Sequence, residues 1–151
     1  MKKPIIIDTC VMSKVFCSTD QGHKDFKPVL DAMKKGKCIM IFGGAKFLGE
    51  MSKQKKLVPL INKMKNVGMM RRLDDKMVDV EQKKIEQIIT HPDFDDPHLP
   101  AMSIVGNCHL ICTEDKRCIP HLKRRDIYST HFRTPRFYTR KEHKRLLYDR
   151  W

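Results

Sequence analysis

Four acidic residues occur where the chain passes between apolar and polar segments: Asp8, Glu50, Asp96 and Asp115. If the fold brings them together, their negative charges repel one another, which raises pKa values or requires a bound cation. Oxygen ligands without an obligatory His or Cys suit Mg²⁺ or Mn²⁺, and Mg²⁺ retains several waters when it binds. A water activated by such a metal could attack a phosphodiester in line. The four carboxylates therefore indicate metal-dependent phosphodiester hydrolysis.

Alternating strands and helices must position these acids. Apolar runs predict strands at residues 3–7, 38–42 and 109–112, with a shorter one within 67–73. Apolar residues at helical spacing predict helices over residues 24–35, 57–64 and 74–89, and another that ends at 105. A last strand beginning at 126–128 and a terminal helix over 139–149, with capping-box spacing at its start, complete the pattern. Since strand–helix–strand order forces parallel pairing, we expect an α/β protein, a three-layer α/β/α sandwich with a mostly parallel central sheet.

The carboxyl-terminal edge of that sheet is where the acids are expected to meet, because strand ends and helix starts converge there. Asp8 and Asp115 each follow a predicted strand. Glu50 lies on the helix after the second strand, and Asp96 opens a later helix. Asp95 competes with Asp96, because neighbouring residues point in different directions.

Thr9, Asp95 and Thr113 are the candidate supporting residues of this site. The two threonines could orient the carboxylates through hydroxyl hydrogen bonds, and simple β-propensity is the alternative explanation for them. His98 is interpreted as a loop histidine, because carboxylate-metal chemistry does not require it. Each acid has its own structural alternative as a turn former, surface acid or helix cap. Those alternatives do not explain why acids occur at all four matching places.

In chain order, these residues resemble the PIN-domain nucleases. The resemblance lies in Asp8-Thr9 after a strand, Glu50 on the following helix, Asp96-x-x-Leu99 opening a helix and Thr113-x-Asp115 after a strand. It spans nearly the whole chain and implies a single PIN-like domain over residues 1–151. It also implies a divalent-metal-dependent endoribonuclease whose four acids are the metal-binding and catalytic residues. The resemblance favours Asp96 over Asp95, while Pro97 and Pro100 depart from the family's usual residues in this helix.

The resemblance further implies a biological setting. The chain would be either a toxin of the VapC type, held inactive by an antitoxin, or a stand-alone RNA-processing enzyme. A catalytically idle PIN-like module that binds RNA or protein is the alternative, and the intact acids favour the enzyme. A receiver-like phosphoacceptor domain would need an aspartate ending the central strand and a lysine ending the last one, which we do not find at those places. A homodimer is also considered, because Leu146, Leu147 and Trp151 could pack on a second chain.

Positive charge is concentrated toward the end of the chain. The protein has 31 Lys or Arg and 18 Asp or Glu, a formal net charge of +13. Residues 116–151 contain twelve of the basic residues and three of the acidic ones, a net charge of +9. Such an excess attracts polyanions, so we expect RNA to bind here through Arg124, Arg125, Arg140 and Lys141. An anionic protein partner, such as an antitoxin, is the alternative.

The remaining composition limits the compartment and the cofactor. No apolar run approaches the roughly 20 residues of a membrane helix, and none is long enough for the core of a signal peptide, so a cytoplasmic location is expected.

The six cysteines are expected to be reduced, because this is not a small cysteine-dense scaffold. A zinc site from Cys108, Cys112, Cys118 and His121 is the less favoured alternative. Cys112 lies in a predicted strand, and paired Cys-x-x-Cys knuckles are absent from the sequence.

Overall fold

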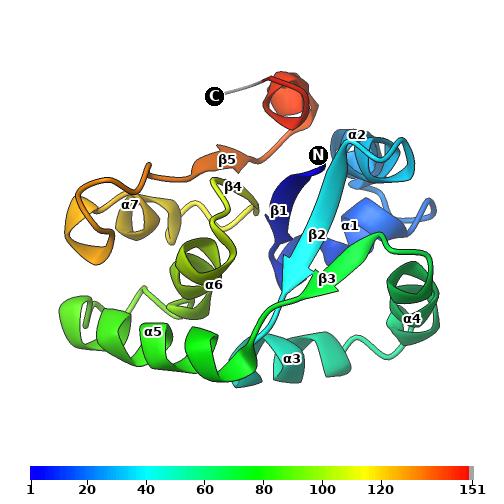
Figure 1. Cartoon of the computed structure of the whole chain (residues 1–151). Helices are drawn as coiled ribbons and strands as arrows, with labels where there is room; N and C mark the ends of the chain where they lie inside the picture. The colour runs from blue at the N-terminus through cyan, green and yellow to red at the C-terminus, as the bar shows by residue number, and fades with distance from the viewer. Residues whose placement is uncertain (150–151) are drawn as a thin grey trace.

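The computed structural model describes residues 1–149 and shows an α/β protein built on a parallel sheet (Figure 1). Within these residues five strands, all parallel, lie in the order β3-β2-β1-β4-β5. The strands are β1 (Lys3–Ile7), β2 (Cys38–Phe42), β3 (Met70–Arg72), β4 (Leu110–Cys112) and β5 (Arg136–Tyr138). The predicted three-layer sandwich with a mostly parallel sheet is confirmed.

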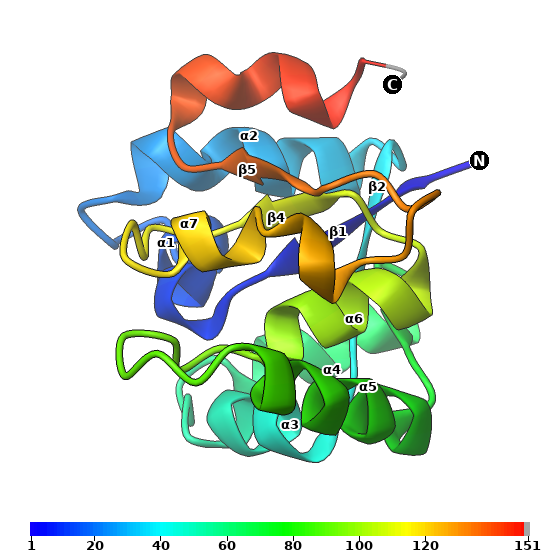
Figure 2. The same ribbon diagram turned by 90° about the vertical axis from the view of Figure 1, so that its left-hand side faces the viewer.

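Helices cover both faces of this sheet (Figure 2). The α-helices are α1 (Met12–Phe16), α2 (His23–Lys34), α3 (Ala45–Ser52), α4 (Val58–Asn66), α5 (Asp75–Ile88), α6 (His98–Gly106) and α7 (Ile119–Leu122). The 3₁₀ helices are η1 (Thr9–Val11), η2 (Arg125–Ile127) and η3 (Lys141–Leu147). On one face lie α2 and η3, while α6 packs on the other with α5 outside it. No helix within residues 1–149 has the length and apolar character needed to span a membrane.

The strand β1 occupies the centre of the sheet, which explains its uninterrupted apolar run. Its three isoleucines have no exposed surface. Ile5 pairs with Met40 of β2, and Ile6 pairs with Ile111 of β4. A parallel strand covered on both faces is apolar throughout rather than alternating. The change from isoleucine to Asp8 therefore marks the edge of the sheet.

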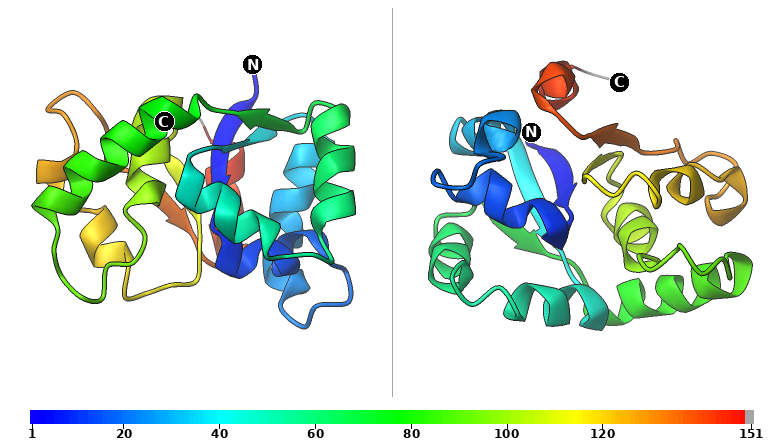
Figure 3. Two further views of the ribbon diagram at one scale, coloured as in Figure 1. Left: turned by 90° about the horizontal axis from the view of Figure 1, so that it is seen from below. Right: turned by 180° about the vertical axis from the view of Figure 1, so that it is seen from behind.

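The amino-terminal ends of α3 and α5 lie side by side (Figure 3). The backbone amide of Gly44 donates to Asp75 at 3.0 Å, and that of Ala45 donates to Asp79 at 2.9 Å. Gly44 has a φ of 87°, and a Cβ atom at this position would lie 2.6 Å from a methyl carbon of Val78. Only glycine accommodates both that backbone conformation and that close approach. Gly44 thus sets the direction in which α3 leaves the sheet.

The last part of the chain differs from its predicted elements. Residues 126–128 do not begin a strand, because η2 ends at Ile127 and β5 begins only at Arg136. The predicted terminal helix over residues 139–149 is present as the 3₁₀ helix η3, Lys141–Leu147, but Thr139 does not cap it. The Thr139 amide instead donates to Nδ1 of His143, 3.1 Å away. Of the predicted packing residues, Leu147 is buried and Leu146 half-buried, whereas Trp151 lies outside the described residues.

Candidate metal centre

The four predicted acids all lie at the carboxyl-terminal edge of the sheet. Asp8 directly follows β1, and its backbone amide donates to the Cys112 carbonyl at the end of β4, 2.9 Å away. Asp115 lies in the loop that follows β4. Glu50 projects from α3, and Asp96 lies just before α6. The fold therefore brings carboxylates to this edge from four separate segments.

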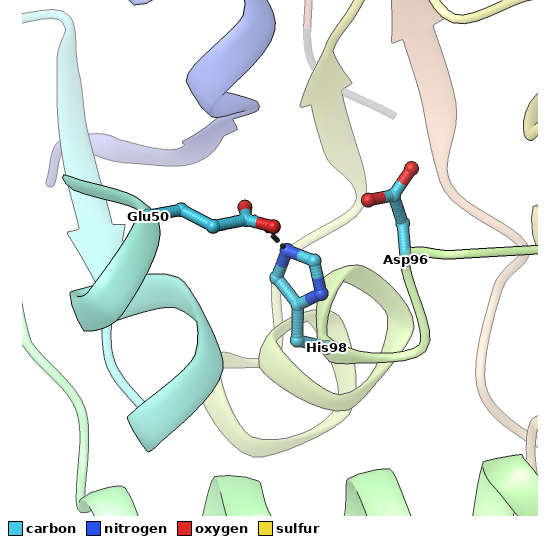
Figure 4. A group of neighbouring side chains, drawn as sticks. All are labelled: Glu50, Asp96 and His98. Carbon is cyan, nitrogen blue, oxygen red and sulfur yellow. Dashed lines mark ion pairs between the residues drawn. The ribbon is translucent and has the colours of Figure 1, made fainter. Parts of the chain in front are cut away.

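Three side chains at this edge form a compact group, Glu50, Asp96 and His98, which we call the metal-ligand group (Figure 4). One ligand atom from each residue lies within 4.8 Å of the other two. Nε2 of His98 lies 3.3 Å from Oε1 of Glu50. Figure 4 shows the imidazole with Glu50 on one side and Asp96 on the other. No other group of this kind occurs within residues 1–149.

Asp8 lies beside the metal-ligand group as a buried carboxylate, with only 3% of its surface exposed. Its Oδ2 accepts a hydrogen bond from Oγ1 of Thr113 at 2.8 Å and one from the thiol of Cys10 at 3.3 Å. After burial, the charge of Asp8 is the largest cause that raises the pKa of Asp96. Asp8 therefore adds negative charge to the metal-ligand group without being one of its three closely spaced members.

The pKa values of Asp96 and Glu50 are shifted in opposite directions. Burial, followed by the charge of Asp8, raises the pKa of Asp96. The contact with His98 lowers the pKa of Glu50, and a 2.9 Å hydrogen bond from Oγ1 of Thr9 acts in the same direction. A raised carboxylate pKa reflects desolvation and repulsion, both of which a nearby cation would offset. A cation beside Asp96 would therefore offset the two main causes of its raised pKa.

Asp115 reaches the same edge but is not a member of the metal-ligand group. Its Oδ1 accepts hydrogen bonds from the backbone amides of Arg117 and Cys118, at 3.1 and 3.3 Å. Its own amide donates to Oγ1 of Thr113, 3.1 Å away. One threonine hydroxyl thus connects Asp8 with Asp115, while one carboxylate oxygen of Asp115 is engaged by its own loop.

The structure distinguishes Asp96 from its neighbour. Asp96 is the member of the metal-ligand group, and its backbone carbonyl accepts from the Leu99 amide at 3.1 Å as α6 begins. Asp95 is exposed, and its backbone carbonyl accepts a hydrogen bond from the Lys46 ammonium group. Asp95 therefore lies outside the group, and within residues 1–149 no hydrogen bond or ion pair of its carboxylate supports its predicted supporting role.

The interpretation of His98 as a loop histidine is wrong. His98 is the first residue of α6 and has no exposed surface. All residues from His98 to Ser103 are buried, so the first turns of this helix are enclosed on every side. An apolar helix without a polar face is typical of a protein interior. The residues Leu99 to Met102 carry that signal, and it would have placed His98 inside the protein.

Two of the predicted nucleic-acid contacts are engaged within their own loop. Arg124 forms a two-pronged ion pair with Asp126. Arg125 donates to the backbone carbonyls of Ser129 and Phe132, at 2.9 and 2.6 Å. The guanidinium of Arg125 therefore holds the loop between η2 and β5, and that of Arg124 pairs within the start of η2, which accounts for both residues without RNA.

The other predicted contacts lie closer to the acids. Arg140 lines a hollow of about 410 Å³ beyond the ends of β4 and β5, and Lys116 lines it too. Its remaining lining residues are Glu114, Thr139 and His143. Glu114 stands between Thr113 and Asp115 in the chain, so the hollow adjoins the carboxylate edge. Lys141 is exposed next to Arg140.

The alternative zinc site is not supported within residues 1–149. All six cysteines are free, and the metal-ligand group contains none of them. Cys108 is completely buried, and this burial raises the pKa of its thiol to about 12. Because metals bind the thiolate, a protonated buried thiol is a poor ligand.

The residues of the metal-ligand group do fit a divalent cation. Two carboxylates supply oxygen ligands, and Asp8 adds charge beside them. Both ring nitrogens of His98 are buried without a hydrogen-bond partner in the described part of the chain. Buried polar atoms of this kind require a partner such as an ion.

Comparison with known proteins assigns neither a family nor a function to this chain, because no family model, no curated protein and no solved structure matches it.

Proposed function

We propose that this protein is a divalent-metal-dependent endoribonuclease of the PIN type, with its active site at the carboxyl-terminal edge of the sheet. The environment of Asp96 carries the proposal. This carboxyl group has a raised pKa because of burial and the charge of Asp8, and it lies within 4.8 Å of Glu50 and His98 ligand atoms. Crowded acids destabilise a fold unless a cation is present, so a metal site is the simplest reason for this arrangement. A cytoplasmic location belongs to the same proposal.

The residues of the site have separate roles in it. Glu50 and Asp96 would hold Mg²⁺ or Mn²⁺, with Asp8 beside them. A bound divalent cation supplies Lewis-acid activation of water and neutralises charge on the scissile phosphate. Thr9 orients the carboxylate of Glu50 through a hydrogen bond of 2.9 Å, and Thr113 orients that of Asp8 through one of 2.8 Å. Carboxylates held in this way lose little freedom when they bind an ion.

RNA would approach along the hollow beyond β4 and β5. Lys116 and Arg140 line this hollow, next to the loop that carries Asp115. Contacts between basic side chains and phosphates supply much of the affinity for nucleic acid without reading its sequence. The proposed backbone contacts are therefore Lys116, Arg140 and the neighbouring Lys141, instead of the loop-bound Arg124 and Arg125.

Cleavage of single-stranded and structured RNA by the purified chain tests this function. Cleavage should require Mg²⁺ or Mn²⁺ and should stop when EDTA is added. We expect Asp96→Asn to lower the rate roughly 100-fold or more, because loss of even a supporting group at a metal site costs about 10- to 100-fold. Asp95→Asn is the matched control, since it removes the adjacent exposed acid and should cleave like the wild type.

Two results would overturn the enzyme assignment. One is cleavage that persists in excess chelator, and the other is equal cleavage by the Asp96→Asn and wild-type proteins. RNA binding without cleavage in any tested metal would instead indicate a catalytically idle RNA-binding module. A co-purifying acidic protein that blocks cleavage would extend the proposal to a toxin controlled by an antitoxin.

A further inference from the structure

His98 is buried at the point where two carboxylates meet, and its ring nitrogens have no hydrogen-bond partner within residues 1–149. The residue has no exposed surface. Nε2 approaches Oε1 of Glu50 to 3.3 Å, but the approach lacks hydrogen-bond geometry. Buried polar side-chain atoms almost always have a partner, so an unpartnered imidazole requires an explanation.

The position of the ring is fixed by its surroundings. His98 begins α6, whose first turns are buried on all sides, and the Phe47 ring of α3 lies 5.9 Å away between centroids. Figure 4 shows the imidazole placed between the carboxylates of Glu50 and Asp96. A side chain held in this way is oriented toward both acids before any ligand arrives, which is the arrangement expected of a metal ligand.

The spacing of the two nearest atoms also suits a shared ion. Protein ligands lie about 2.0–2.2 Å from a small divalent cation, so two adjacent ligands of one ion lie roughly 3 Å apart. Nε2 of His98 and Oε1 of Glu50 are separated by 3.3 Å. A simple ion pair between Glu50 and His98 would also explain this distance, but it would not explain why Asp96 lies on the other side of the ring with a ligand atom within 4.8 Å of both residues.

We propose that His98 supplies a nitrogen ligand to the metal site and makes the site selective for a first-row transition-metal dication over Mg²⁺. The inference rests on the metal site of the proposed function and deepens it by naming the class of metal. Mg²⁺ prefers oxygen ligands and gives up its waters reluctantly. Imidazole suits Fe, Ni, Cu and Zn, whose affinities for mixed nitrogen and oxygen sites exceed that of Mg²⁺. A set of one imidazole and two carboxylates therefore favours the transition metals.

Electron spin-echo spectroscopy of the full chain with Mn²⁺ alone tests the ligand directly. The wild-type spectrum should show modulation from a coordinated ¹⁴N nucleus, and this modulation should disappear in His98→Gln. His131→Gln is the matched control, because it removes an exposed histidine outside the metal-ligand group and should retain the signal. A wild-type spectrum without nitrogen coupling, or coupling that persists in His98→Gln, would overturn the inference. If His98→Gln does not fold, His98→Phe takes its place in the same comparison.

Calorimetric titration with Co²⁺ and with Mg²⁺ tests the selectivity. We expect His98→Gln to lower Co²⁺ affinity by at least about tenfold, the lower end of the range for removal of supporting groups, and to change Mg²⁺ affinity much less. His98→Phe, which fills the buried space without a nitrogen, should behave in the same way. Equal decreases in Co²⁺ affinity and Mg²⁺ affinity in these variants would overturn the inference. RNA cleavage without nitrogen coupling would support the proposed function and refute His98 as a metal ligand. Nitrogen coupling without RNA cleavage would support His98 as a ligand and refute the proposed function.

Discussion

Thr113 connects two of the acids through one hydroxyl, so its removal measures how firmly the fold holds the site. The residue has no exposed surface. Its Oγ1 donates to Oδ2 of Asp8 at 2.8 Å and accepts from the amide of Asp115 at 3.1 Å. Thr113→Val keeps the shape of the side chain but removes both hydrogen bonds and the 3.7 Å contact of the hydroxyl with the Cys10 thiol. It leaves a buried carboxylate with only the thiol of Cys10 as a side-chain donor within residues 1–149.

The expected decrease in stability follows from these two hydrogen bonds. A hydrogen bond to a charged group contributes about 1.5–3 kcal/mol, and a neutral one contributes about 0.5–1.5 kcal/mol. Since water can replace part of the bond at the less buried Asp115, we expect Thr113→Val to lower the free energy of unfolding by about 2–4 kcal/mol. Thr113→Ser keeps both bonds and removes one buried methyl group, which corresponds to about 1 kcal/mol.

Urea unfolding followed by circular dichroism, in the presence of EDTA, compares Thr113→Val, Thr113→Ser and the wild type. Equal slopes of the three curves would show that the variants differ in stability and not in unfolded-state compactness. A valine variant within about 0.5 kcal/mol of the wild type, the range of an ordinary surface substitution, would refute the reasoning. Equal destabilisation by serine and valine would refute it as well, because the methyl group and not the hydroxyl would then carry the effect.

Two further predictions concern the charges around the site. The pKa of Asp96 is higher in the folded protein than in the unfolded chain, so the folded protein loses stability as the pH rises from the unfolded pKa to the folded one and this carboxyl group ionises. Asp96→Asn should therefore stabilise the metal-free protein at neutral pH but not in acid. Urea unfolding across pH measures this difference, and a less stable variant at neutral pH would contradict it. Replacement of Lys116 and Arg140 by Ala should reduce the salt slope of RNA binding by roughly 0.7 for each phosphate that these side chains neutralise in the wild type. Arg124→Ala, whose guanidinium pairs with Asp126, should leave the slope unchanged, and an equal reduction there would contradict the placement of RNA.

Long local patterns predicted most of the fold. The apolar runs predicted β1 and β2 with their observed bounds, because strands buried on both faces have few other solutions. The last strand was predicted to begin at residues 126–128, whereas β5 begins only at the exposed Arg136 and has three residues. Its pairing depends on distant partners, such as the His109 carbonyl that accepts from the Arg136 amide at 2.8 Å. The predicted terminal helix is present as the shorter 3₁₀ helix η3, whose His143 accepts from the Thr139 amide at the position predicted to cap it.

The candidate site divides in the same way. By itself, the sequence determined that carboxylates stand at strand ends, because a residue that follows a strand is tied to the sheet edge by the chain itself. Only the tertiary structure decided which side chains meet there. In the folded protein, Asp96 and not Asp95 belongs to the metal-ligand group, and His98 lies 3.3 Å from Glu50. One carboxylate oxygen of Asp115 accepts a hydrogen bond from a backbone amide of its own loop. These outcomes depend on how α3 and α6 pack against the sheet, and side-chain distances across such contacts are set by buried partners far away in the sequence.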